Sequence, residues 1–108
     1  MTEIYEGQPN VFAEIGVADP ETHLLKAKLV VEIVRLVRKR GLTQAAAGAL
    51  MGISQPEVSR MFRGHLREYS VERLMTLLTT FDRDVEIVVK PREGNGENGL
   101  ITVRHQAA

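Results

Sequence analysis

Apolar residues recur over residues 20–40 at the three- and four-residue spacing that places side chains on one face of an α-helix. Six apolar positions share that face, and polar residues recur on the opposite one. The apolar set is Leu29, Val30, Ile33, Val34, Leu36 and Val37, and the polar set is Lys28, Glu32, Arg35 and Lys39. The pattern predicts a long helix with a broad buried stripe. Asp19 and Pro20 suit its N-terminus, and Gly41 suits its end.

Three shorter helices are predicted next, each opened by a residue that caps a helix N-terminus. They cover residues 43–51, 54–63 and 70–81, with Thr43, Ser54 and Ser70 as their caps. Ser54 and Glu57 have the Ser-x-x-Glu spacing of a capping box, in which each side chain accepts from the other residue's N–H. Tyr69 and Leu74 flank the third cap at the spacing of a hydrophobic staple.

The period of the pattern changes after residue 84. Val85, Ile87 and Val89 alternate with charged residues, which predicts a strand, and residues 100–103 predict a second. Between them, residues 94–99 contain two Asn-Gly pairs, which favour a hairpin turn. Because an isolated hairpin is marginal in water, we expect this one to pair with a second subunit or to pack on the helices. The predicted fold is a mainly α helical bundle with a C-terminal β-hairpin.

Length and composition indicate one globular domain. The chain has 108 residues, of which 44% are hydrophobic, and no cysteine. It has no apolar run near the ~20 residues of a membrane helix and no signal-peptide pattern, so we expect a cytoplasmic protein without disulfides. Its predicted parts are an acidic N-terminal arm with a short helical turn, a helical domain, and a hairpin with a tail: residues 1–18, 19–83 and 84–108.

The formal charge of zero conceals a separation of charge along the chain. Residues 1–24 carry five acidic groups and no Lys or Arg, which gives −5. Residues 25–69 carry nine basic and three acidic groups, or +6, and residues 70–108 carry five basic and six acidic groups, or −1. Such asymmetry favours two different partners, although it is also compatible with ordinary surface charge.

Residues 42–64 carry the most informative pattern. Two short helices joined by a tight turn at Gly52 must cross at about 90–120°, which requires small residues where they touch. Ala47 and Gly48 supply them. A glycine inside a short helix costs about 1 kcal/mol relative to alanine, and close backbone approach would explain it. The second helix then turns three apolar residues toward the core: Ile53, Val58 and Met61.

The opposite face of this second helix is polar. It presents Gln55, Pro56, Ser59, Arg60 and Arg63, while its carboxylate belongs to the capping box. A helix in the major groove reads bases through residues near its N-terminus. Glutamine bonds adenine through two contacts, serine bonds several base edges, and arginine prefers guanine or phosphate. The alternative interpretation is an ordinary solvent-exposed face.

The segment resembles the helix-turn-helix of the phage-repressor-like (Xre/Cro) superfamily. The matching residues are Gln44, Gly48, Gly52, Ile53, Ser54, Val58, Ser59 and Gly64. The resemblance implies that residues 54–63 form the recognition helix and residues 43–51 the supporting helix. Ala46 departs from the pattern, because many relatives carry a glutamate there that completes a capping box. The fold expected is therefore a phage-repressor-like helix-turn-helix bundle, with residues 19–83 as its DNA-binding domain.

The interface with double-stranded DNA is predicted residue by residue. Base readout is assigned to Gln55, Ser59 and Arg60, and phosphate contact to Gln44, Ser54, Arg63 and Arg67. Since one such module reads a half-site, we expect a homodimer on an inverted-repeat operator. Its half-sites should lie one helical turn (~34 Å) apart or a multiple of it.

Over about residues 10–90 the chain also resembles HigA-type antitoxins of type II toxin–antitoxin modules. The matching stretches are residues 10–16, the long helix, residues 41–44 and residues 81–87. The resemblance implies a protein that represses its own operon and neutralises a RelE-like toxin, a small basic ribonuclease. The acidic arm is one docking surface for such a toxin and the C-terminal hairpin is its rival. The alternative is a stand-alone regulator without a toxin.

No enzyme, cofactor or metal site is expected. Residues 94–99 satisfy G-x-G-x-x-G, but a β-run follows them where a dinucleotide site needs a helix. His23, His65 and His105 lack the spacing of paired ligands. His65 lies beside two arginines, where a phosphate contact and a solvated loop are equally compatible with the sequence. No triad or carboxylate pair indicates catalysis.

Overall fold

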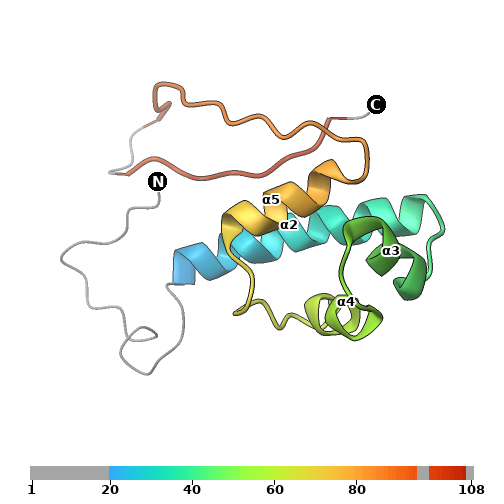
Figure 1. Cartoon of the computed structure of the whole chain (residues 1–108). Coiled ribbons are helices and arrows are strands. Elements are labelled where there is room, and N and C mark those ends of the chain that lie inside the picture. Colours follow the sequence, from blue (N-terminus) through green and yellow to red (C-terminus); the bar gives the residue numbers. More distant parts are fainter. Residues whose placement is uncertain (1–19, 95–97, 107–108) are drawn as a thin grey trace.

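The computed structural model describes residues 20–94 and 98–106. Within them lie four helices: α2 (Pro20–Lys39), α3 (Gln44–Met51), α4 (Gln55–Phe62) and α5 (Val71–Thr79). In Figure 1, α5 packs along α2, while α3 packs against α4, which also contacts α2. None of these helices is long and apolar enough to cross a bilayer. The helical turn expected in residues 1–18, and the predicted cap Asp19, lie outside the described residues.

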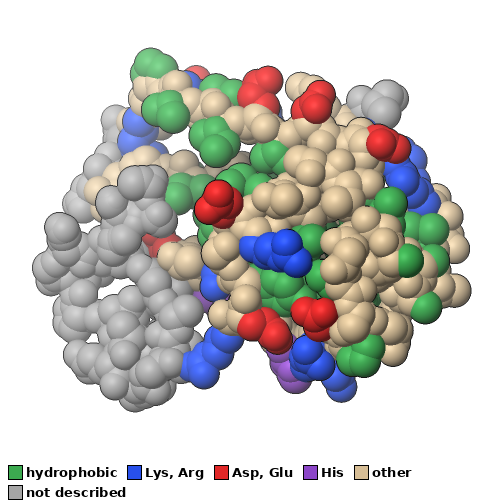
Figure 2. Space-filling view, in the orientation of Figure 1, with side chains coloured by type: hydrophobic (Ala, Val, Ile, Leu, Met, Phe, Trp, Pro, Cys, Tyr) green, Lys and Arg blue, Asp and Glu red, His purple; other side chains and the backbone are tan. Residues whose placement is uncertain are grey.

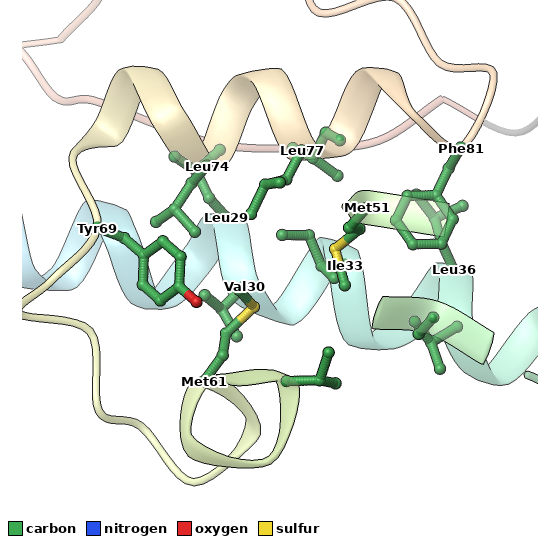
Figure 3. Packing of buried hydrophobic residues seen from close by; sticks show 14 of the residues in the cluster. Leu29, Val30, Ile33, Leu36, Met51, Met61, Tyr69, Leu74, Leu77 and Phe81 are labelled. Carbon is green, nitrogen blue, oxygen red and sulfur yellow. The ribbon is translucent and has the colours of Figure 1, made fainter. Parts of the chain in front are cut away.

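The core forms where α2 meets the three shorter helices, and the predicted apolar stripe of α2 is its base. Leu29, Val30, Ile33, Leu36 and Val37 are buried, and Val34 is half-buried against them. Figure 3 shows α5 contributing Leu74 and Leu77 from above and Met61 entering from α4. This cluster fixes how α3 and α4 sit on the long helix.

The predicted N-terminal caps of the three shorter helices are present. The hydroxyl of Thr43 accepts from the N–H of Ala46 at 3.0 Å, and that of Ser70 accepts from the N–H of Arg73 at 2.9 Å. The capping box of α4 is complete and is described with the interface below. Each cap satisfies a backbone donor that the helix leaves unpaired. At the other end of α2, Gly41 has φ +64°, the left-handed conformation that ends a helix readily at glycine.

Arg40 ties the end of α2 to the end of α5. Its Nη2 donates to the carbonyl oxygen of Phe81 at 2.6 Å and lies 3.3 Å from the carboxylate of Asp82. The guanidinium also stacks 5.6 Å from the centre of the Phe81 ring. Asp82 has φ +61°, an uncommon conformation for a residue with a Cβ. Arg40 thus satisfies a carbonyl just beyond α5 and holds the chain where it leaves the bundle.

The predicted C-terminal β-hairpin is wrong for the described residues. Residues 84–94 and 98–106 contain no strand, appear without arrows in Figure 1, and make no backbone–backbone hydrogen bond to each other. The second segment packs on the helices instead, with Val103 against the core and His105 Nδ1 3.6 Å from the carboxylate of Glu32. Alternation in the sequence indicates an extended segment, but residues 98–106 are held against the helices, so residues 84–92 find no partner strand among the described residues.

Candidate nucleic-acid interface

The crossing of α3 and α4 depends on the missing side chain at Gly48. A Cβ built there would lie 2.6 Å from the carbonyl oxygen of Ile53 and 3.3 Å from Cγ2 of Val58. The carbonyl oxygen of Gly48 also accepts from the N–H groups of Gly52 and Ile53, at 2.7 and 2.9 Å. Close backbone approach therefore explains this glycine, as predicted. These two hydrogen bonds hold the turn, and the turn sets the angle between α3 and α4.

The helix α4 has one face in the core and one in solvent. Val58 and Met61 are fully buried, and Phe62 and Ile53 are half-buried against the core, which confirms the predicted inward set. On the other side, three residues of the first turns are exposed or half-exposed: Gln55, Pro56 and Ser59. The solvent-facing side of α4 therefore carries Gln55 and Ser59, two of the three side chains predicted to read bases.

A hydrogen bond joins the first residues of the two helices. Gln55 Nε2 donates to Gln44 Oε1 at 2.9 Å, across eleven residues of sequence. Both glutamines were predicted site residues, but the contact between them was not predicted. The signal for it was that each glutamine directly follows its helix cap, so both side chains start from the same end of the helix pair. The bond places the two amides side by side at the start of both helices.

The bond leaves each amide with a defined set of free hydrogen-bonding groups. Gln44 uses its oxygen as an acceptor, so its two N–H groups remain to donate to a phosphate. Gln55 uses one N–H, so it keeps one donor and its oxygen as an acceptor. The major-groove edge of adenine presents one acceptor, N7, and one donor, N6–H. The remaining groups of Gln55 therefore match adenine.

The capping box of α4 is complete. Ser54 Oγ accepts from the N–H of Glu57 at 3.2 Å, and Glu57 Oε1 accepts from the N–H of Ser54 at 2.9 Å. The backbone hydrogen bond from Ser54, followed by that with its side chain, lowers the pKa of Glu57 below its ordinary value. The hydroxyl of Ser54 keeps its own proton to donate. The box thus orders the N-terminus of α4 and leaves a donor at the position where a phosphate contact is predicted.

The three arginines of the predicted site are held differently. Arg60 Nε lies 3.6 Å from the carboxylate of Glu68, and both side chains are half-exposed. Arg63 bends back on its own helix, where its Nε donates to the carbonyl oxygen of Ser59 at 3.3 Å. Arg67 is exposed on the loop that follows α4. The structure therefore brings Gln44 and Gln55 together and pairs Arg60 with Glu68, a partner that was not predicted.

Nothing in the described part of the chain gathers three or more metal-ligating side chains. His65 is exposed on the loop after α4, and His105 lies beside Glu32 on α2. The glycine-rich stretch at 94–99 falls partly outside the described residues. The polar groups that α3 and α4 offer to a ligand are therefore the hydrogen-bond donors and acceptors described above.

Known proteins match this arrangement. Residues 11–90 match the sequence model of a family described as "Helix-turn-helix domain". A solved structure named "Putative XRE Family Transcriptional Regulator" is 37% identical, with a TM-score of 0.73 over 82% of this chain and 100% of that chain. None of the curated proteins matches the chain. With the fold, the caps and the helix crossing described above, these similarities establish that the chain belongs to the XRE-type helix-turn-helix family of DNA-binding proteins.

Proposed function

We propose that α4 enters the major groove of an operator and that the chain acts as a sequence-specific transcriptional repressor. The observation that carries this proposal is the hydrogen bond between Gln44 and Gln55, because it leaves Gln55 with the donor and acceptor that adenine requires. Ser59 lies one turn further along the same face and extends the reading surface.

Arg60 is the third base-reading residue of the proposal. Its guanidinium is half-exposed, and its 3.6 Å ion pair with Glu68 is of the weak surface kind. Exchanging that partner for a guanine edge therefore requires little energy. Phosphate contacts come from Gln44, Ser54, Arg63 and Arg67, around the two ends of α4.

The repressor works as a homodimer on an inverted repeat. One recognition helix contacts only a few base pairs, so two copies related by a two-fold axis are needed to specify an operator. The half-sites then lie one helical turn (~34 Å) apart or a multiple of it.

The proposal is tested by selecting binding sequences from a random duplex pool with the wild-type chain and then with a Gln55→Ala variant. Gln55→Ala should lose about 1–3 kcal/mol of discrimination at one base pair, if its contact is bidentate. Gln106→Ala, at an exposed glutamine on the C-terminal segment, is the matched control and should select the wild-type sequence. If Gln55→Ala bound every operator variant as the wild type does, the assigned role would be wrong.

Phosphate contact has a different signature. Arg63→Ala should weaken binding to all duplexes alike and reduce the slope of log K against log salt by about 1, since one cation–phosphate contact is lost. Fluorescence anisotropy over a salt series measures this slope. If Arg63→Ala instead changed the preferred sequence and kept the salt slope of the wild type, Arg63 would be a base-reading residue.

We further propose that the protein is an antitoxin, which represses its own operon and also neutralises a basic RelE-like ribonuclease. The supporting observations are the resemblance to HigA-type antitoxins and the −5 charge of residues 1–24, which complements a basic partner. The acidic arm over residues 1–18 is the proposed docking surface. The competing function is a stand-alone regulator, which accounts equally well for the helix-turn-helix.

The neighbouring gene separates the two functions. A small basic ribonuclease-like reading frame beside this gene, whose toxicity is relieved by co-expressing the chain, supports the antitoxin. Glu3→Gln, Glu6→Gln and Glu14→Gln together should weaken that rescue and leave operator binding intact. The absence of such a frame, with no toxin retained in a pull-down, would leave the stand-alone regulator.

A further inference from the structure

The segment from residue 84 to residue 92 leaves the helical bundle with its apolar side chains uncovered. Ile87 is 73% exposed, Val88 66% and Val89 92%. Figure 2 shows apolar side chains standing on the surface at the top of the molecule, where Figure 1 places the C-terminal segments. The backbone of residues 84–92 makes no backbone–backbone hydrogen bond within the described part of the chain. Such an unpaired extended segment is a template for another strand.

We propose that this segment pairs with the same segment of a second copy, as two antiparallel strands centred on Val88. In this register Val88 faces Val88 of the partner subunit, Glu86 faces the partner's Lys90, and Asp84 faces the partner's Arg92. Two-fold symmetry repeats both charge pairs, which gives four in all. None of these four charged residues has an ion-pair partner among the residues that the structure describes.

The faces of the paired strands also separate by chemistry. Because side chains alternate along a strand, Val85, Ile87, Val89 and Pro91 share one face. In the proposed register Val85 faces the partner's Pro91, and Ile87 faces the partner's Val89. One face of the ribbon is therefore apolar throughout, and the other carries the four charge pairs around the central valines.

Pro91 agrees with this pairing. Proline has no N–H to donate, so it must occupy a position whose N–H points away from the partner strand. Antiparallel pairs alternate between hydrogen-bonded and non-hydrogen-bonded positions. With Pro91 in a non-hydrogen-bonded pair, Val88 falls in a hydrogen-bonded one, and the backbone of the central residues is satisfied across the two-fold axis.

Neighbouring registers are poorer in charge pairing. Centring on Ile87 keeps one opposite-charge pair, Asp84 with the partner's Lys90. It leaves Glu86 opposite Val88, and it requires Asp82, which Arg40 already holds at 3.3 Å, to meet Arg92. A register centred on Glu86 places this residue opposite the partner's Glu86. Like charges directly opposite destabilise a strand pair. The charge pattern thus selects the Val88-centred register.

This inference deepens the homodimer of the proposed function, but it concerns the free protein and does not depend on which DNA is bound. The first measurement is the dimer dissociation constant by analytical ultracentrifugation in the absence of DNA. A ribbon this short implies a weak dimer, on the order of micromolar. A wild-type chain that stays monomeric at its highest soluble concentration overturns the inference.

Charge reversal tests the register. Glu86→Lys and Lys90→Glu should each raise the dimer dissociation constant about ten-fold, because each places two like-charge pairs in the symmetric ribbon. The double variant Glu86→Lys/Lys90→Glu restores opposite charges and should recover most of the loss. A double variant no tighter than either single one overturns the pairing of these two residues.

Cross-linking tests the same register in a chain that has no native cysteine. Val88→Cys should form a disulfide dimer under mild oxidation, since the two thiols face each other across the axis. The matched control is Val85→Cys, whose thiols would lie about 20 Å apart, six residues along the strands. Equal cross-linking of the two variants, or cross-linking at Val85 alone, overturns the inference. Gln55→Ala should dimerise as the wild type does, which separates a failure here from a failure of the DNA-reading proposal.

Discussion

The two short helices at residues 43–63 and the extended segment at residues 84–92 both contain closely spaced apolar residues, but they bury them very differently. Val58 and Met61 are completely buried, whereas Val89 is 92% exposed. A helix satisfies its backbone internally and needs only one face covered, which α2 supplies. An extended segment must find the partner for its backbone in another segment or another chain. The first region is therefore complete within one chain, and the second is not.

The largest expected effect concerns the point where α3 and α4 touch. Gly48→Ala should destabilise the fold by about 3 kcal/mol, because its methyl group would lie 2.6 Å from the carbonyl oxygen of Ile53, so that the backbone of the turn would have to shift. The gain in helix propensity of about 1 kcal/mol does not offset this. Urea denaturation gives the free energy of unfolding. Gly99→Ala is the matched control, since nothing lies within 4 Å of its added Cβ, and an equal loss there would contradict the explanation.

A second pair of substitutions measures the contrast between the regions directly. Val58→Ala removes fully buried methyl groups and should cost about 2 kcal/mol of unfolding free energy. Val89→Ala makes the same chemical change at an exposed position and should change the stability of the monomer by less than about 0.5 kcal/mol. Thermal unfolding at low protein concentration compares the two. Similar losses at both positions would mean that the C-terminal segment is packed within the single chain.

Local signals explain which parts of the fold and site could be predicted from the sequence. The cap at Ser54, the glycine at the helix crossing and the buried face of α4 depend on residues close together in sequence, and all were predicted. The contact between Gln44 and Gln55 depends on the angle between two helices, and the pairing of Arg60 with Glu68 depends on the path of a loop. Neither angle nor path is encoded in a short pattern.

The prediction of a C-terminal hairpin was wrong for a related reason. Alternation at residues 85–89 indicates an extended segment, but it does not indicate which strand satisfies its backbone. Within the described residues, Val103 packs on the helical core and His105 lies against Glu32, so the expected partner strand is engaged elsewhere. The hydrogen bond from Arg40 to the carbonyl of Phe81 was not predicted either, because it depends on how α5 packs beside the end of α2.

The smallest expected effect is a pH dependence at the N-terminus of α4. Since hydrogen bonds from Ser54 lower the pKa of Glu57 in the folded state, the ionised carboxylate stabilises the fold. This contribution is fully present above the pKa of Glu57 in the unfolded chain, about 4.3, and is lost as the pH falls through the lower folded value. Glu57→Gln keeps an acceptor for the N–H of Ser54 but cannot ionise. The urea midpoints of the wild type and Glu57→Gln should therefore differ slightly at pH 7 and converge in acid. If the difference between the two midpoints were the same at pH 7 and in acid, the capping box would act through its geometry rather than its charge.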